Sequence, residues 1–369
     1  MRLAFLGLSA SGKTTLFNAL TGAHASVGTY SGAGTEIHIG RIEVADPRLQ
    51  VVARLFKPKK VTPAVVEVVD TPPLAVAAHE NREGNARLVA TLREAEGLVL
   101  VVRAFASDRV PHPRTSVDPV RDLNELRAEL VVADLDVVEK RLHKLDVEIK
   151  RGSAPPTAPR EHAALERCRK ELDAGRSVRA AELNEEETKL LSSFAFLTLK
   201  PTLVALNVGE EVLREEAPRT WIRVASSDAG KLHVAGIPAL EVCAEWEMEV
   251  HDLPKSEWET YLGDLGIEEH CEDRFVRAAY ELMDVITFFT CNDNELRAWQ
   301  LKRYSKALDA AAAVHTDMAK GFIRAEVIAL RDLKALGSVK DVRAAGKERL
   351  EGKTGPVMDG DLIHFRFSV

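Results

Sequence analysis

The stretch Gly7-Leu8-Ser9-Ala10-Ser11-Gly12-Lys13-Thr14 decides the fold, because it has the form GxxxxGK[ST] of a phosphate-binding loop. An apolar run at 3–6 before it reads as a buried strand, and the residues from Thr15 onward read as a helix with one apolar face. In this context the loop N–H groups and the positive end of the helix surround the β-phosphate of a nucleoside triphosphate. Lys13 is expected to reach the β- and γ-phosphates, and the Thr14 hydroxyl to bind magnesium. A ligand-free turn does not explain these two residues together, so the predicted binding residues run from the first glycine through Thr15.

Two further residues are candidate magnesium ligands. Asp70 ends the apolar run 65–69, and phosphate-loop enzymes hold magnesium, directly or through water, with a carboxylate at the end of a neighbouring strand. The competing interpretation of Asp70 is a cap before Thr71-Pro72. Thr29 and Thr35 stand in a glycine-rich segment of the kind that closes over magnesium and the γ-phosphate, and Thr35 is the preferred candidate. The predicted metal ligands are Thr14, Thr35 and Asp70.

Size and composition indicate a soluble, multidomain protein. The chain has 369 residues, of which 46% are hydrophobic and 29% charged, and three domains are expected because one core rarely serves this length. No apolar run reaches the roughly 18 residues needed to cross a bilayer. A structural strand already starts at residue 3, so the N-terminus does not read as a signal peptide and a cytoplasmic location is expected. Neither a disulfide framework nor a zinc site is indicated by the widely spaced Cys168, Cys243, Cys271 and Cys291.

The charge pattern does not point to nucleic acid. The net charge of −7 provides no global attraction to phosphates, although a local basic face is compatible with it. The densest basic cluster spans residues 54–60, and we favour a solvated loop over an RNA contact for it.

The order of apolar runs indicates an α/β layout. Runs at 3–6, 64–69, 98–102 and 202–206 are typical of strands buried on both faces, and helical patterns lie between them. Alternating apolar residues at 37–44 predict one half-exposed strand. The long gap before the fourth run indicates an insertion.

The insertion reads as a helical hairpin. From residue 122 onward leucines recur at a three-four spacing with charged residues between them, which predicts a long helix of coiled-coil type. Gly152 and a proline cluster at 155–159 end it, and a second helical pattern continues from Glu161 toward Leu191. Two interpretations stay open: the helices pack only on each other, or they form an arm that contacts something large.

Past residue 282 the pattern changes to that of a small α+β domain. Two strand-like runs, 285–290 and 296–301, flank a polar turn as in a hairpin, and an alanine-rich helix is expected at 306–314. Further strands are expected at 322–328 and 362–367.

With these features placed, the chain resembles the YchF or Obg-like ATPase family from end to end, as a divergent member. The most specific matching stretches are His315-Thr316-Asp317 with residues 320–327, and Asp359-Gly360-Asp361 with His364-Phe365-Arg366-Phe367. Others are Lys57-Pro58-Lys59-Lys60, Val117-Asp118-Pro119-Val120-Arg121-Asp122, residues 133–142 and Arg277-Ala278-Ala279-Tyr280-Glu281-Leu282.

The resemblance implies an α/β fold: a P-loop GTPase-like domain with an inserted α-helical coiled-coil hairpin and a C-terminal ubiquitin-like (β-grasp) TGS domain. The implied boundaries are 1–121 and 197–282 for the two parts of the nucleotide-binding domain, 122–196 for the insert and 283–369 for the TGS domain. Family members bind and slowly hydrolyse ATP and associate with ribosomes. The implied cofactors are therefore ATP, or alternatively GTP, and Mg²⁺, and the implied partner is the ribosome or ribosomal RNA. No membrane association is implied, and the sequence indicates no oligomeric state.

By the same resemblance, Asn207-Val208-Gly209-Glu210 is the base-reading motif, in place of the Asn-Lys-x-Asp of GTPases. A short Asp pairs with the N1–H and 2-amino groups of guanine, and adenine offers neither donor. With Val208 in place of the stacking lysine and the longer Glu210 in place of Asp, the selection of guanine should relax. The competing interpretation is that Asn207 merely ends a strand. Cys243 and Ala244 would lie in the companion loop near the base.

Three departures from the family pattern concern this site. Ala10 lacks the Asn side chain with which related GTPases hold an activating potassium ion, so potassium stimulation is not expected. Pro73 replaces the glycine of Asp-x-x-Gly, whose N–H contacts the γ-phosphate, and proline has no N–H to donate. Residues 30–35 replace the family's Tyr-Pro-Phe-x-Thr segment, which leaves the alignment of Thr35 open by one residue.

No residue is singled out as catalytic. Many GTPases carry a water-orienting Gln at the position of Leu74, whereas members of the resembled family carry a hydrophobic residue there. His79 reads as a solvated loop residue. Two functions stay open. We favour a slow ATPase whose nucleotide state sets its attachment to ribosomes or another large assembly. The alternative is a nucleotide-binding scaffold in which Pro73 impairs hydrolysis and which binds RNA, the ribosome or another partner constitutively.

Overall fold

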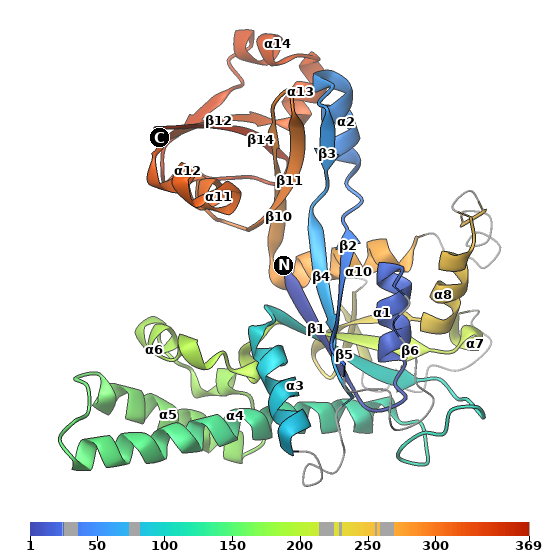
Figure 1. The fold of residues 1–369 in the computed structure, drawn as a ribbon, viewed down its shortest axis with the longest axis vertical. Coiled ribbons are helices and arrows are strands. Elements are labelled where there is room, and N and C mark those ends of the chain that lie inside the picture. The colour runs from blue at the N-terminus through green and yellow to red at the C-terminus, as the bar shows by residue number, and fades with distance from the viewer. Residues whose placement is uncertain are drawn as a thin grey trace. The chain divides into compact units, whose positions relative to one another are not determined.

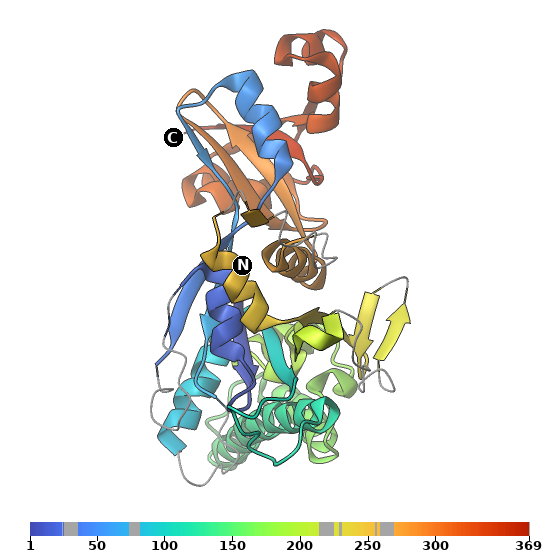
Figure 2. The same ribbon diagram turned by 90° about the vertical axis from the view of Figure 1, so that its right-hand side faces the viewer.

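The computed structural model describes residues 1–23, 25, 36–73, 82–213, 225–228, 231–254, 257–258 and 269–368. Contacts within the chain divide it into two units, one of residues 2–40 and 68–271 and the other of residues 1, 41–67 and 272–369. Figures 1 and 2 show the ribbon from two sides. In the described part of the chain, no helix is both long enough and apolar enough to span a membrane.

The larger unit is built on a sheet with the strand order β2-β4-β1-β5-β6-β9-β8-β7. The predicted buried strands are confirmed as β1 (Arg2–Gly7), β4 (Val65–Asp70), β5 (Gly97–Ala104) and β6 (Thr202–Val208). β1, β5 and β6 run parallel, so their carboxyl ends meet at one edge of the sheet. The half-exposed strand is confirmed as β2 (His38–Glu43), in which exposed residues alternate with part-buried or buried ones.

Three further strands extend this sheet beyond β6. β9 (Ile237–Val242) pairs parallel with β6, and β8 (Lys231–Val234) and β7 (Ala225–Asp228) follow in antiparallel pairing. No sequence pattern predicted these three strands, because they are short and lack a continuous apolar run.

The helices of the larger unit pack against these parallel strands. α1 (Lys13–Thr21) contacts α8 (Ala244–Asp252), and Figure 1 shows the two side by side. α3 (Arg82–Glu94) places Leu88 and Leu92 in a core with residues of β1 and β5. A short helix, α7 (Glu210–Leu213), follows β6.

The inserted hairpin is confirmed as a pair of long helices. α4 (Pro119–Lys150) and α5 (Ala158–Asp173) lie side by side in Figure 1, and their facing residues form a core of their own, with Val138 and Leu142 near Leu165. α4 begins before the predicted residue 122, because the Asp118 side chain accepts the N–H of Arg121 at 3.0 Å and caps the helix.

Shorter helices return the chain from the hairpin to β6. They are η1 (Val178–Ala181), α6 (Glu185–Leu190), η2 (Ser192–Phe194) and η3 (Leu197–Leu199). The two helices of the hairpin do pack on each other, as one of the open interpretations expected. The coiled-coil geometry itself stays a prediction.

The smaller unit is built on a second sheet, with the order β13-β12-β14-β10-β11-β3. The predicted hairpin is confirmed as β10 (Val285–Cys291) and β11 (Glu295–Lys302), and the later strands as β12 (Phe322–Ala329) and β14 (Asp361–Phe367). The sheet ends in the short strands β13 (Arg349–Glu351) and β3 (Lys60–Thr62).

Each face of this second sheet has its own core. The predicted alanine-rich helix is α11 (Ala307–Val314), which packs on the face that carries Phe288, whereas Phe289 points into a core with α2 (Pro47–Phe56) and α13 (Leu330–Leu336). The other helices are α10 (Cys271–Met283), α12 (Thr316–Lys320) and α14 (Val339–Ala344). The ubiquitin-like assignment of this domain stays a prediction.

Residues 41–67 pack with the C-terminal residues, whereas the predicted boundaries group them with 1–121. β3 pairs parallel with β11, and Arg48 Nη1 donates to Asp359 Oδ2 at 2.7 Å although the two residues are 311 positions apart. The basic cluster at 54–60 is therefore not a plain loop. It comprises the end of α2 and the start of β3, with the side chains of Arg54, Lys57, Lys59 and Lys60 exposed.

Candidate nucleotide site

The loop between β1 and α1 needs glycine at both ends of its motif. A Cβ atom added to Gly12, whose φ is 83°, would lie 2.0 Å from Asn207 Nδ2. A Cβ atom added to Gly7 would lie 2.7 Å from the carbonyl oxygen of Val101. The spacing of the two glycines thus reflects two close approaches between the loop and the neighbouring strands β5 and β6.

Lys13, Thr14 and Asp70 converge at the carboxyl ends of β1 and β4. Lys13 Nζ lies 2.6 Å from Asp70 Oδ1 and also donates to the carbonyl of Thr71, and Thr14 Oγ1 donates to Asp70 Oδ2 at 2.8 Å. Both charged side chains are buried, at 6% exposure for Lys13 and 3% for Asp70. Burial lowers the pKa of the Lys13 ammonium, and the adjacent carboxylate opposes this shift.

The donor set at this point suits magnesium. Thr14 and Asp70 offer a hydroxyl and a carboxylate, the oxygen ligands that Mg²⁺ prefers. The described residues hold no group of three or more His, Cys, Asp and Glu side chains that could bind a metal. Few protein ligands are needed here, because Mg²⁺ in phosphate-loop sites takes its remaining ligands from phosphates and water.

Asn207 connects the phosphate loop to the predicted companion loop. Its Nδ2 donates to the carbonyl of Ser11 at 3.0 Å, and its Oδ1 accepts the N–H of Ala244 at 3.0 Å. The side chain is buried, with 4% of the residue exposed. Among the described residues the Asn207 amide donates only to Ser11, so its second N–H is available for the N7 acceptor that adenine and guanine share.

The other two side chains of the base motif differ in exposure: Val208 is buried and Glu210 is exposed. Val208 is 1% exposed and packs in the core of the larger unit, so its side chain does not face the site and only its backbone could contact a base. Side chains alternate along β6, which turns Val208 away from the direction that Asn207 takes. Glu210 is exposed at the start of α7.

Ala244 is the first residue of α8, Cys243 is the N-cap before it, and both are buried. Burial raises the pKa of the Cys243 thiol to about 11, so this sulfur stays protonated at neutral pH and is not a nucleophile. The contact that this loop makes with Asn207 is the backbone N–H of Ala244.

The remaining loop residues divide between core and surface. Leu8 is 4% exposed in the hydrophobic core, Ser9 is exposed, and Ser11 is buried. Ala10 has a positive φ of 60°, a conformation that costs a non-glycine residue about 1 kcal/mol or more and that lets successive N–H groups converge. Thr15 follows on the first turn of α1 and is part-buried.

Several predicted residues lie outside the described part of the chain. Thr29 and the preferred magnesium ligand Thr35 are among them, as are Leu74 and His79. Pro73 is described and is part-buried. It follows Thr71, whose hydroxyl donates to the carbonyl of Phe5 at 2.5 Å and ties the end of β4 to β1.

Two residues near the site were not predicted. His38 Nδ1 in β2 lies 3.7 Å from Asp70 Oδ2, and only the pairing of β2 with β4 brings them together, so no local pattern could have indicated it. Arg103 lies 2% exposed at the end of β5 and its guanidinium donates to the carbonyl of Ala10 at 3.4 Å. A charged residue at the end of a run of buried apolar residues was the available signal.

Two family models match the chain. Residues 2–140 match a family described as "50S ribosome-binding GTPase", and residues 285–368 match the YchF-GTPase C-terminal family, described as a protein of unknown function.

Named relatives match over the whole chain. The "Ribosome-binding ATPase YchF" of Bacillus subtilis is 35% identical over 99% of this chain and 98% of its own length, and that of Haemophilus influenzae is 36% identical over 100% and 99%. "Obg-like ATPase 1" of Oryza sativa subsp. japonica is 31% identical over 100% of this chain and 92% of its own length.

Solved structures with a similar fold also cover the whole chain. The structure of the Schizosaccharomyces pombe YchF GTPase superposes with a TM-score of 0.79 at 25% identity, covering 99% of this chain and 97% of the other. A GTP-binding protein from Pyrococcus horikoshii gives a TM-score of 0.60 at 17% identity with full coverage of both chains, which supports the fold alone.

Proposed function

Since this chain belongs to the family of YchF and Obg-like ATPases, we propose that it is a slow ATPase whose nucleotide state sets its association with the ribosome. The observation that carries the proposal is the convergence of Lys13 and Thr14 on Asp70, at 2.6 and 2.8 Å. A cation, a hydroxyl and a carboxylate at the ends of adjacent strands are what a triphosphate with its metal ion requires.

In the proposed site, the loop from Gly7 to Thr14 binds the β-phosphate through its backbone N–H groups. Lys13 moves from Asp70 toward the β- and γ-phosphates, while Thr14 and Asp70, with Thr35 as a third candidate, hold Mg²⁺. When bound there, Mg²⁺ would supply charge neutralisation at the phosphate oxygens. Positioning and charge stabilisation make up the catalytic contribution that these residues can supply.

For the base, we propose adenine as the preferred partner and guanine as the weaker one. The second N–H of the Asn207 amide, which has no acceptor within the described ranges, can donate to N7 of either purine, so it does not discriminate between them. Discrimination then depends on Glu210, the backbone of Val208 and the companion loop at Cys243 and Ala244. A longer, exposed Glu210 holds the guanine N1–H and 2-amino group less firmly than a short Asp does.

Slow turnover follows from Pro73 in this proposal. A hydrogen bond to a charged acceptor contributes roughly 1.5–3 kcal/mol, and proline cannot donate one to the γ-phosphate. The second candidate function, a hydrolysis-impaired scaffold, is favoured by the same residue and differs in having no measurable turnover.

The proposed partner is the ribosome, which the relatives' names state for those proteins, with ribosomal RNA as the alternative. With that partner, a cytoplasmic location follows. The helical insert at 122–196 and the TGS domain at 283–369 are the proposed contact regions. The proposed nucleotide-binding domain comprises 1–121 and 197–282, except that residues 41–67 pack with the C-terminal residues. The net charge of −7 means that any RNA contact must be local.

Phosphate release from ATP, measured with and without ribosomes, tests the proposal. We expect slow release that depends on Mg²⁺ and that Lys13→Met abolishes, because the lysine contacts the phosphates directly. Measurable ATP binding with no release in either condition would refute the ATPase and leave the scaffold. A Lys144→Met variant, altered at an exposed position of α4, is the matched control for release measured without ribosomes and should retain the wild-type rate there.

A further inference from the structure

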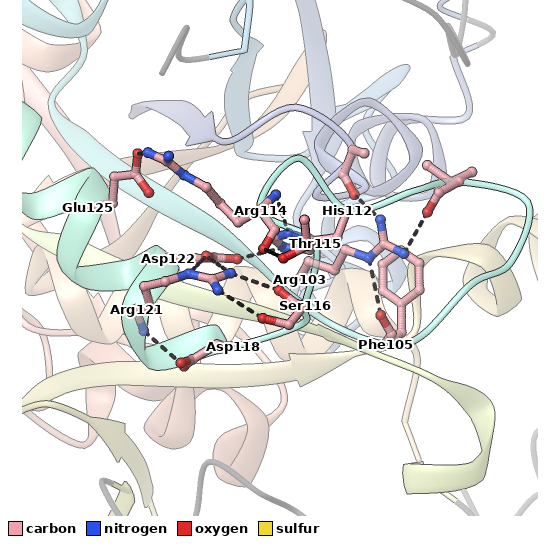
Figure 3. Close-up of polar contacts among 12 residues, drawn as sticks. Arg103, Phe105, His112, Arg114, Thr115, Ser116, Asp118, Arg121, Asp122 and Glu125 are labelled. Carbon is pink, nitrogen blue, oxygen red and sulfur yellow. Dashed lines mark hydrogen bonds and ion pairs between the residues drawn. The ribbon is translucent and has the colours of Figure 1, made fainter. Parts of the chain in front are cut away.

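Arg103 is a buried cation whose hydrogen bonds to other described residues go to backbone carbonyls. In the described part of the chain its Nε donates to Phe105 at 3.1 Å, Nη2 to Val110 at 2.9 Å and Nη1 to Ala10 at 3.4 Å. Figure 3 shows the guanidinium at the centre of these contacts, beside the ring of Phe105. Burial lowers its pKa, and the charge of Asp122 opposes this shift. Burying a charged guanidinium is unfavourable unless hydrogen bonds compensate for the loss of water, so the contacts of Arg103 indicate a specific role.

The carbonyl of Ala10 belongs to the phosphate loop. Arg103 on β5 and Asn207 on β6 are register partners, and they hold two successive loop carbonyls, those of Ala10 and Ser11. In a loop that binds an anion, the N–H groups must point inward and the carbonyls outward. Two donors on neighbouring strands therefore hold the carbonyls in the direction that such a loop needs, at the residue with the strained φ of 60°.

Arg103 also bonds to Phe105 and Val110 in the connection between β5 and α4, and this connection is anchored on α4. Figure 3 shows the connection from β5 to α4 folded back over the start of the helix, where His112 Nε2 lies 2.9 Å from Asp122 Oδ2. The N–H of Arg114 donates to His112 Nδ1 at 3.0 Å, so in the neutral ring Nε2 carries the proton and donates to Asp122.

The Asp122 carboxylate is also held by an arginine, Arg121. Arg121 donates to the other oxygen of Asp122 at 2.7 Å and to the carbonyl of Ser116 at 2.8 Å. Asp122 is 2% exposed, so the connection closes over it. Arg103 therefore bonds to a connection that is itself fixed on the helical insert.

We propose that Arg103 is a positioning residue of the phosphate loop: it holds the carbonyl of Ala10 so that the loop N–H groups converge on the β-phosphate. This inference rests on the proposed nucleotide binding. Arg103 itself does not contact the nucleotide in this arrangement. A neutral side chain of similar length would leave the Ala10 carbonyl without its donor and free the loop to adopt other conformations.

Calorimetric titration with Mg²⁺-ATP and Mg²⁺-ADP tests the role of Arg103, with thermal unfolding of the ligand-free protein measured in parallel. Arg103→Met should weaken both nucleotides roughly tenfold or more, the equivalent of one hydrogen bond from a charged donor. Arg103→Lys keeps the charge but cannot fork between Ala10 and Val110, so it should show a smaller loss.

Arg93 provides the matched control. Its side chain is part-buried and its guanidinium donates to three carbonyls, those of Ala133, Phe194 and Ala195, at 3.0, 3.0 and 3.2 Å, and none of these belongs to the phosphate loop. Arg93→Met should lower the unfolding temperature while the nucleotide affinity stays within about twofold of wild type. Should either methionine variant fail to fold, the pair Arg103→Lys and Arg93→Lys makes the same comparison.

Two results would overturn the inference. One is an Arg103 variant with wild-type affinity for both nucleotides, and the other is an equal loss in the Arg93 variant, which would reduce the effect to general destabilisation. Wild-type protein that binds neither nucleotide would refute the proposed function and this inference together. Normal binding by wild type with unchanged binding by Arg103→Met refutes this inference alone.

Discussion

At the residue scale, Pro73 separates the two candidate functions. It stands where the family's γ-phosphate donor is a glycine, and it lies three residues after Asp70 in a chain segment that Thr71 ties to β1. Pro73→Gly restores an N–H at that position. We predict that steady-state phosphate release rises roughly tenfold, because a hydrogen bond to a charged group contributes about 1.5–3 kcal/mol.

The neighbouring proline supplies the control for this change. Pro72→Gly adds the same N–H and the same backbone freedom one position earlier, and should leave the rate within about twofold of wild type. Equal rates for wild type and Pro73→Gly would show that the missing donor is not what makes the enzyme slow. Equal acceleration by both variants would assign the effect to loop flexibility.

At the element scale, Asp134 anchors α4 to the segment that leads back to β6. The side chain is 0% exposed, accepts the N–H groups of Leu197 and Thr198 at 3.0 and 2.8 Å, and lies 3.1 Å from Arg93 Nη1. Asp134→Ala leaves the N–H groups of Leu197 and Thr198 and the part-buried guanidinium of Arg93 without this acceptor. We predict a loss of about 3 kcal/mol or more in the free energy of unfolding, measured by urea denaturation.

Asp136 in the same helix is the control for Asp134. Its side chain is 55% exposed and pairs with Lys140 four residues later, so Asp136→Ala should cost less than about 0.5 kcal/mol. Comparable losses in the two variants would mean that Asp134 does not anchor the helix.

In the smaller unit, Glu326 makes the stability of β12 and β14 depend on pH. Arg366 Nε donates to its carboxylate at 2.9 Å, and this hydrogen bond is the main reason that the pKa of Glu326 is lowered to about 2. Because the folded pKa lies below the ordinary value of 4.5, the stabilisation is complete above that pH and is lost as pH falls toward 2.

Urea denaturation at about pH 5 and about pH 3 measures this effect. Glu326→Gln should lose less stability between the two pH values than wild type, because the amide cannot be protonated in that range. Parallel losses in both proteins would assign the acid sensitivity to other carboxylates.

Local sequence patterns predicted the elements whose signal is local. The buried strands, the hairpin of β10 and β11 and the helices of the insert follow from runs and periodicities that each segment carries alone. The placement of 41–67 does not, because it depends on pairing between β3 and β11 and on the contact between Arg48 and Asp359.

The same limit applies to the site. The motif identified Lys13, Thr14 and Asp70, which the structure brings together. It did not reveal that Val208 is buried or that Arg103 holds the loop, because both depend on which strands lie beside β1. Side-chain direction along β6 follows from the strand's register, and the motif carries no information on it.

At the scale of the whole molecule, the chain forms two compact units, and each unit is built from segments that are separated in the sequence. The residues that converge on Asp70, together with Asn207 and Arg103, all belong to the larger unit, so that unit alone contains the described nucleotide site. Binding should nevertheless be measured on the whole chain. Residues 41–67, which belong to the smaller unit, interrupt the sequence of the larger unit between residues 40 and 68.

Calorimetric titration of the full chain with Mg²⁺-ATP and with Mg²⁺-GTP is the most direct test of the central claim, that this protein binds adenine nucleotide through the loop from Gly7 to Thr14. We predict that ATP binds roughly tenfold more tightly than GTP, a difference of one or two hydrogen bonds. Lys13→Met should abolish the binding of both. Tighter binding of GTP would contradict the role assigned to Glu210, and ATP binding that survives Lys13→Met would contradict the site itself.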